Sequence, residues 1–78
     1  MARYFFHSEG VDSHHDSEGV DLVDDRFARV QATQLLGEML KDRAQDFADG
    51  RMRTLTISVV DGEGRLQVVL TAAIVRSA

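Results

Sequence analysis

The sequence contains no cysteine, so disulfide bonds and thiolate metal sites are excluded. It has no run approaching the roughly 20 apolar residues that a membrane-spanning helix needs. The apolar start MARYFF ends at His7, short of the core of about 7 to 15 residues typical of a signal peptide. We therefore expect a cytoplasmic protein with no membrane partner.

The chain length of 78 residues predicts one small domain, residues 1–78. A domain of this size buries only about 60% of the surface that its unfolded chain exposes. Composition is that of a folded protein, with 44% apolar and 28% charged residues. Because the core is small, we expect dense packing or an oligomeric partner to stabilise the fold.

Lysine and arginine are absent from residues 7–25. Seven acids lie there: Glu9, Asp12, Asp16, Glu18, Asp21, Asp24 and Asp25. The other residues hold nine bases and six acids, and the whole chain has a net charge of -4. Contacts with phosphate need lysine or arginine, so this acidic segment argues against nucleic acid as its partner.

The N-terminal third predicts two strands. The aromatic stretch RYFFH, residues 3–7, has the composition of a partly buried strand. After a turn at Gly10, the stretch SHHDS, residues 13–17, predicts a short returning strand. If residues 9–12 form a four-residue connection, His7 lies opposite His14.

The middle of the chain predicts one long amphipathic helix. Apolar residues recur at helical spacing from Ala28 to Phe47, with polar residues on the opposite side. Acidic residues up to Asp25 are suitable helix caps, and Gly50 is placed as a left-handed terminator. We expect a helix of about 24 residues, from Asp25 to near Asp49.

Two C-terminal stretches, 54–60 and 66–71, alternate between apolar and polar residues in the manner of half-buried strands. The polar stretch DGEG, residues 61–64, predicts the turn that joins them. A four-residue connection pairs Val59 with Leu66, whereas a two-residue turn shifts the pairing by two residues. Both alternatives leave the same side chains on the same face.

The order of elements predicts an α+β domain, β-β-α-β-β, with a four-stranded antiparallel sheet and one long amphipathic helix on one face. One helix covers only one face of the sheet. We expect the other face, with Val60, Val69, Thr71 and Phe5, to be a moderately apolar surface suited to self-association. The predicted core consists of Tyr4, Phe6, Leu35, Leu36, Met39, Leu55, Ile57, Val59, Leu66, Val68 and Leu70.

Three short motifs resemble a family of small bacterial domains, common in alphaproteobacteria, that has no assigned function. They are an aromatic strand ending in histidine, a D-x-E-G-x-x-L-x-D segment before a helix, and a V-x-D-x-x-G-R hairpin. The resemblance covers nearly the whole chain and implies the same architecture, without catalytic residues. Adjacent histidines at 14 and 15 are not usual in that family. The matching residues are 3–7, then Asp16, Glu18, Gly19, Leu22 and Asp24, then Val59, Asp61, Gly64, Arg65 and Leu66.

Histidines and an acid near the N-terminus form the strongest chemical candidate. Imidazoles and a carboxylate bind divalent transition metals when three of them converge, so His7, His14, His15 and Asp16 predict a metal site. Neighbouring strand residues point to opposite faces, so only one of His14 and His15 can join His7. A second hypothesis needs no metal: nearby carboxylates favour protonated imidazoles, which predicts a response to mild acid. No other cofactor is expected.

No catalytic motif is present, and we expect a protein that is not an enzyme. The first hypothesis is an interaction module that binds a second copy or another protein through Val60, Val69 and Thr71. Metal binding or pH response is the alternative at the N-terminus. A nucleic-acid-binding regulator is a further alternative, in which a rim of arginines at one end of the sheet would contact the nucleic acid. Against it, charged side chains at solvated strand edges explain the same arginines. Its arginine rim is Arg51, Arg53, Arg65 and Arg76.

Overall fold

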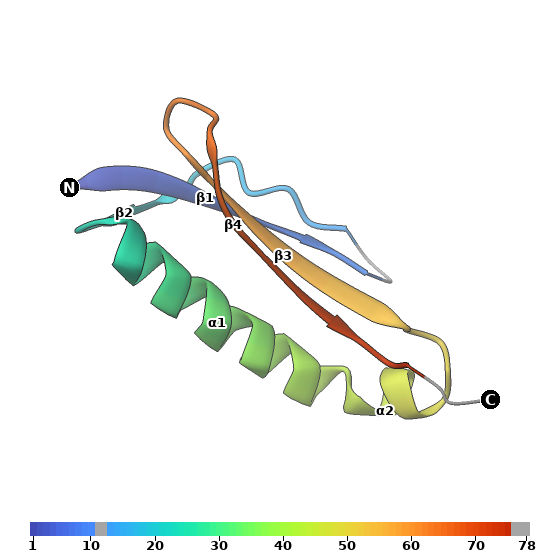
Figure 1. Ribbon diagram of the computed structural model, residues 1–78. Coiled ribbons are helices and arrows are strands. Elements are labelled where there is room, and N and C mark those ends of the chain that lie inside the picture. Colours follow the sequence, from blue (N-terminus) through green and yellow to red (C-terminus); the bar gives the residue numbers. More distant parts are fainter. Residues whose placement is uncertain (11–12, 76–78) are drawn as a thin grey trace.

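The computed structural model describes residues 1–10 and 13–75 and shows an antiparallel sheet with a long helix along one face (Figure 1). The order of strands across the sheet is β2-β1-β3-β4, so β4 forms one edge and the short β2 forms the other. This confirms the predicted α+β class with four antiparallel strands. The elements are β1 (Ala2–Glu9), β2 (Val20–Leu22), α1 (Asp25–Asp42), α2 (Ala44–Ala48), β3 (Thr54–Asp61) and β4 (Leu66–Ala73).

The core lies between α1 and the sheet face that carries alternate residues of β1 and β3. Its buried sheet residues are Tyr4, Phe6, Leu55, Ile57 and Val59. Ala28 and Ala32 of α1 have 0% exposure, because their small side chains let the helix lie close to the sheet. Around them pack the partly buried residues Leu22, Leu35, Leu36, Met39, Val68 and Leu70. Except for Leu66, the predicted core is confirmed.

The hairpin between β3 and β4 has a register two residues away from the predicted one. Val59 pairs with Val68, so both predicted connections are wrong, although the faces other than that of Leu66 remain as predicted. The backbone amide of Asp61 donates to the carbonyl of Arg65 at 2.9 Å, which leaves three residues, 62–64, in the turn. Gly64 has a φ of 81°, and a three-residue hairpin commonly ends in such a left-handed glycine.

Leu66 lies outside the core, contrary to prediction. A β-bulge interrupts the hairpin, where Val60 pairs with Leu66 but Val59 pairs with Val68. The additional residue, Gln67, reverses the alternation of side chains at this point. Leu66 therefore lies beside Val60 and is 61% exposed.

The helical region is divided in two, so the prediction of one helix of about 24 residues is wrong. Asp24 caps α1 by accepting a hydrogen bond from the amide of Phe27 at 3.1 Å. The 18 residues of α1 span about 27 Å, close to the roughly 26 Å of the eight-residue β3. Beyond the sheet the chain has to turn back, and it does so at Arg43 and α2. Gly50 has a φ of 76° and ends the helical region as predicted.

The second strand lies later in the chain than predicted. β2 is Val20–Leu22, whereas the predicted stretch 13–17 contributes only one bridge, between Ser8 and His14. The pairing of His7 with His14 is therefore wrong by one residue. The predicted connection at residues 9–12 lies partly outside the described residues.

Residues 15–19 cover the β1 part of the sheet face opposite α1 (Figure 1). His15 stacks on His7, and Gly19 lies so close to Phe5 that a Cβ atom there would meet the Phe5 ring at 2.9 Å. Gly19 also has a φ of 78°, which favours glycine. Phe5 is consequently half-buried, and the predicted open face is reduced to its β3 and β4 part.

Candidate functional site

We use the term closed edge for the side of the sheet that contains β2 and residues 14–19, which lie along β1. The carboxylate of Asp16 holds it together. Its Oδ2 accepts a hydrogen bond from the amide of Phe6, and its Oδ1 accepts from the amides of Glu18 and Gly19, all at 3.1 Å. If the pairing of Tyr4 with Val20 continued regularly, Glu18 would lie opposite Phe6. The Asp16 side chain therefore replaces a missing strand partner.

These hydrogen bonds favour the ionised carboxylate. The amide of Gly19 is the largest influence that lowers the pKa of Asp16, followed by the amides of Phe6 and Glu18 and the charge of His7. Burial acts in the opposite direction but does not prevail. Asp16 is therefore ionised near neutral pH and ties the closed edge to β1.

His7 and His15 form a stacked pair on the closed edge. Their ring centroids lie 4.1 Å apart, and the two ring planes differ by 8°. The backbone amide of Asp16 donates a hydrogen bond to Nδ1 of His7 at 3.1 Å. Nδ1 accepts here only when it carries no proton, so this contact depends on the protonation state of His7.

The four predicted metal ligands do not all lie in the same part of the structure. His15 is the neighbour that joins His7, whereas His14 lines a groove of about 390 Å³ with Phe6 and with residues of α1. Both carboxylate oxygens of Asp16 are occupied by backbone amides. Among residues 1–10 and 13–75, no three histidine, aspartate or glutamate side chains are grouped so that they could hold a metal ion. The metal hypothesis stays a prediction without support from this geometry.

A buried contact between Tyr4 and Asp25 was not predicted from the sequence. The Tyr4 hydroxyl donates to Oδ1 of Asp25 at 2.6 Å, and Tyr4 is 2% exposed. This hydrogen bond, together with burial, raises the pKa of Tyr4 to about 12. It joins β1 to the first turn of α1. A lone tyrosine in the first strand and an acid in the first helical turn were the only signals for it.

The other side of the sheet, the regular part of β4 from Val68 to Ala73, is called the open edge. The amide of Ile74 donates to the carbonyl of Arg53 at 3.0 Å. Hydrogen-bonded pairs alternate along an antiparallel ladder, so the even-numbered residues of β4 bond to β3. The backbone groups of Val69, Thr71 and Ala73 then point away from the sheet.

Charge and proline, two common forms of protection against further pairing, are absent from this edge. β4 contains no charged residue and no proline, the usual features that stop one edge strand from pairing with another. At its beginning, the Asp61 carboxylate fixes the hairpin. Asp61 accepts from the amides of Glu63 and Arg65 and from the side chain of Gln67, each at 2.9 Å. The amide of Arg65 is the largest influence that lowers the pKa of Asp61.

An apolar strip borders the open edge on the face opposite α1. It consists of Val60, Leu66 and Val69, of which Leu66 is 61% and Val69 is 49% exposed. Thr71 lies on the same face, with its hydroxyl 3.1 Å from that of Thr56. The structure thus brings together the predicted interaction residues Val60, Val69 and Thr71, and adds Leu66, whose exposure the sequence did not reveal.

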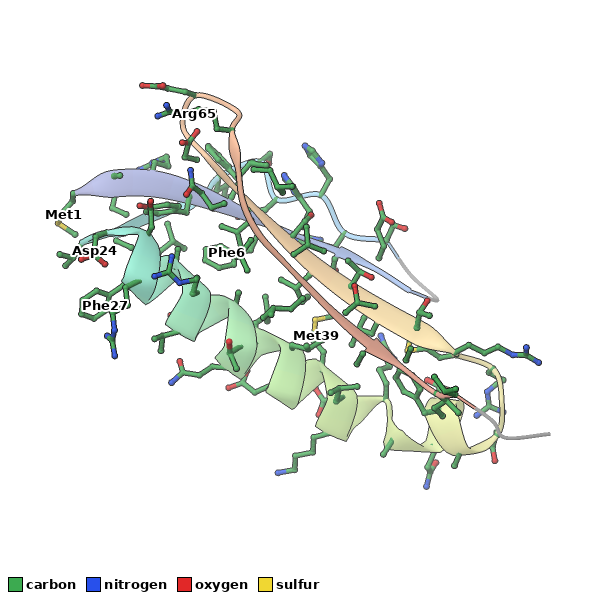
Figure 2. The ribbon with its side chains drawn as sticks, in the orientation of Figure 1. Met1, Phe6, Asp24, Phe27, Met39 and Arg65 are labelled. Carbon is green, nitrogen blue, oxygen red and sulfur yellow. The ribbon has the colours of Figure 1, made fainter. Side chains whose placement is uncertain are left out.

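The four arginines of the predicted rim do not meet at one end of the sheet. Arg65 lies in the hairpin (Figure 2), at the opposite end of β3 and β4 from Arg51 and Arg53, so this part of the prediction is wrong. Arg76 lies outside the described residues. Two of the rim arginines are already paired: Arg51 with Asp46 and Asp49, and Arg65 with Asp61 and Glu63. The nucleic-acid alternative gains no support.

The fold and site define a small α+β domain in which one helix covers a sheet with one closed and one open edge. Within the described part of the chain, neither helix is long and apolar enough to cross a membrane. The chain belongs to the family described as Domain of unknown function (DUF6894), whose model matches residues 3–74. No curated protein and no solved structure gives a significant match. The alphaproteobacterial origin implied by the resemblance stays a prediction.

Proposed function

We propose that this domain is a non-enzymatic protein-interaction module of the cytoplasm and that it self-associates through the open side of its sheet. The single observation that carries the proposal is the unprotected open edge, bordered by the apolar strip. An edge strand presents a row of unpaired amides and carbonyls, which another strand can satisfy. Apolar side chains beside that edge add a surface that gains stability when it is removed from water.

The distribution of charge supports the same contact surface. Among the described acids of the N-terminal segment, Glu9 lies in β1 and Asp21 in β2, and β4 is two strands away from β1 and three strands away from β2. With strands about 4.8 Å apart, these separations are about 10 Å and about 14 Å, both beyond the screening length of about 8 Å at physiological salt. Two molecules that meet at their open edges therefore keep their acidic segments far apart. Nearer to β4, the carboxylates of Asp61 and Glu63 pair with Arg65.

Light scattering over a concentration series tests the proposal. At high micromolar concentration we expect the mean mass to rise from 8.7 kDa toward that of a dimer. The variant Val69→Lys places a charge at the open edge and should remain at the monomer mass. Gln34→Lys, with the same charge change on the exposed side of α1, serves as the matched control and should associate like the unaltered protein. A strict monomer at these concentrations contradicts the proposal.

A second candidate function, a response to pH at the closed edge, is favoured by the contact between the Asp16 amide and Nδ1 of His7. When Nδ1 takes up a proton it becomes a donor, and this hydrogen bond is lost. We expect the amide resonance of Asp16 to titrate together with the ring resonances of His7 and His15 in an NMR pH series. An Asp16 amide that does not change while the His7 ring titrates contradicts this candidate.

A further inference from the structure

We infer that the occupant of the open edge is a second copy of this chain, paired antiparallel through β4 with the two-fold axis at Thr71. This inference rests on the proposed function and adds the partner, its orientation and the register. The joined sheet would have eight strands. Because the axis is perpendicular to the sheet, the α1 helices of both copies would lie on the same face.

The register between the two copies follows from the part of β4 that pairs regularly with β3. The bulge opposite Val59 and Val60 interrupts β4 before Val68, and the ladder with β3 then continues to the hydrogen bond of Ile74. The uninterrupted stretch is therefore 68–74, and its midpoint is Thr71. Residues 69, 71 and 73 carry the outward-pointing backbone groups. An antiparallel copy centred on Thr71 pairs each of them with another outward-pointing residue and leaves the bulge outside the contact.

Side chains in this register are complementary. On the face opposite α1, Thr71 meets Thr71 of the second copy, and Val69 meets Ala73. On the face of α1, Leu70 meets Ala72. Within β4, large residues thus lie opposite small ones, and at the end of the stretch Val68 meets Ile74 in an apolar pair. Threonine pairs are favourable across strands, and no charge faces a like charge. A partner with acidic or basic residues in its strand would lack this match with the uncharged β4.

A register shifted by two residues is the nearest alternative, and it makes a different prediction. With the axis at Leu70, Val69 would lie opposite Thr71 of the second copy. That arrangement extends the contact into the bulge at Leu66 and Gln67, where the backbone of β4 is not regular. Pairs of equivalent residues distinguish the two registers, because their separation grows with their distance from the axis.

Spin labels test the register directly, since the chain has no native cysteine. We expect a nitroxide at Thr71→Cys to show strong dipolar broadening at concentrations where the mass is dimeric. Matched labels at Val69→Cys and Ala73→Cys should each be farther from their equivalents, by an offset of about 13 Å along the strand. Equal broadening at positions 69 and 71 would place the axis at Leu70 and overturn the inferred register.

Hydrogen exchange of the unlabelled protein provides a second measurement that does not depend on the variants. The amides of Val69, Thr71 and Ala73 should exchange quickly at low concentration and become protected as the dimer forms, whereas the amide of Leu70 should be protected at both. A dimer by mass in which these three amides remain unprotected overturns the strand pairing but leaves self-association intact. A monomer by mass contradicts both proposals.

Discussion

Every sheet edge has backbone amides and carbonyls without a strand partner, and the two edges of this sheet differ in how these groups are satisfied. At the closed edge, β2 is only three residues long, and the carboxylate of Asp16 takes the place of a strand partner for Phe6. At the open edge, the regular part of β4 carries no charge, and the backbone groups of Val69, Thr71 and Ala73 point away from the sheet. Short, charged edges resist pairing with other chains, whereas long, uncharged edges invite it. This difference is the reason for proposing β4 as the contact surface, and it gives Asp16 a structural role at the closed edge.

The largest expected effect on the free energy of unfolding comes from truncating a buried side chain in the core between α1 and the sheet. Ile57 lies on the central strand with 0% exposure. Ile57→Ala should lower the free energy of unfolding by about 2–5 kcal/mol, because it removes buried methyl groups and leaves a cavity. Chemical denaturation followed by circular dichroism measures it, with Ser58→Ala on the opposite face as the control. A loss below that of the control would contradict the placement of the core.

Opening the closed edge should have a smaller effect. Asp16→Asn leaves one acceptor oxygen where the carboxylate has two, so at least one of its backbone amides loses a partner. We expect a loss of about 1–2 kcal/mol in the free energy of unfolding, given that the carboxylate is partly in contact with water. Faster hydrogen exchange of the Phe6 amide should accompany it. The control is Glu18→Gln, whose side chain is exposed; equal effects of the two variants would remove the assigned role of Asp16.

Acid should destabilise both edges, because an ionised aspartate stabilises each of them: Asp16 at the closed edge and Asp61 at the beginning of the open edge. The pKa values of Asp16 and Asp61 are lowered in the folded protein, so each carboxylate stabilises the fold above its unfolded pKa of about 3.9. That stability disappears as the pH falls through the folded pKa. The difference in unfolding free energy between the unaltered protein and Asp16→Asn should therefore shrink below about pH 4. A difference that is constant with pH would contradict the ionised role of Asp16.

The smallest expected effect is a spectroscopic one at Tyr4, where β1 meets α1. Tyr4 is the only tyrosine, so alkaline absorbance titration reports on it alone. Its midpoint should be about 12 in the folded protein and about 10 in denaturant. Because the folded pKa is raised, this contact stabilises the fold below about pH 10 and is lost as the pH rises toward 12. Asp25→Asn should lower the midpoint, whereas Asp42→Asn at the far end of α1 should not.

Much of the closed edge could not be predicted, because its contacts depend on residues far apart in the sequence. His7, His14, His15 and Asp16 were selected for their chemistry, and local spacing indicated that only one of the adjacent histidines would join His7. Which one did so depended on a single backbone pair, Ser8 with His14. Moving that pair by one residue reverses the side on which each histidine lies.

By itself the sequence determined which side chains share an apolar face: the alternation in β3 and in β4 from Val68 onward, and the helical spacing from Ala28 onward, are local patterns. It also determined the end of the helical region at Gly50, since a left-handed residue there needs no distant partner. Only the tertiary structure decided the register, the exposure of Leu66, the place of β2 and the break at Arg43. The physical reason is that a turn, a bulge and the length of the sheet act on whole elements, and their consequences appear only when those elements are packed together.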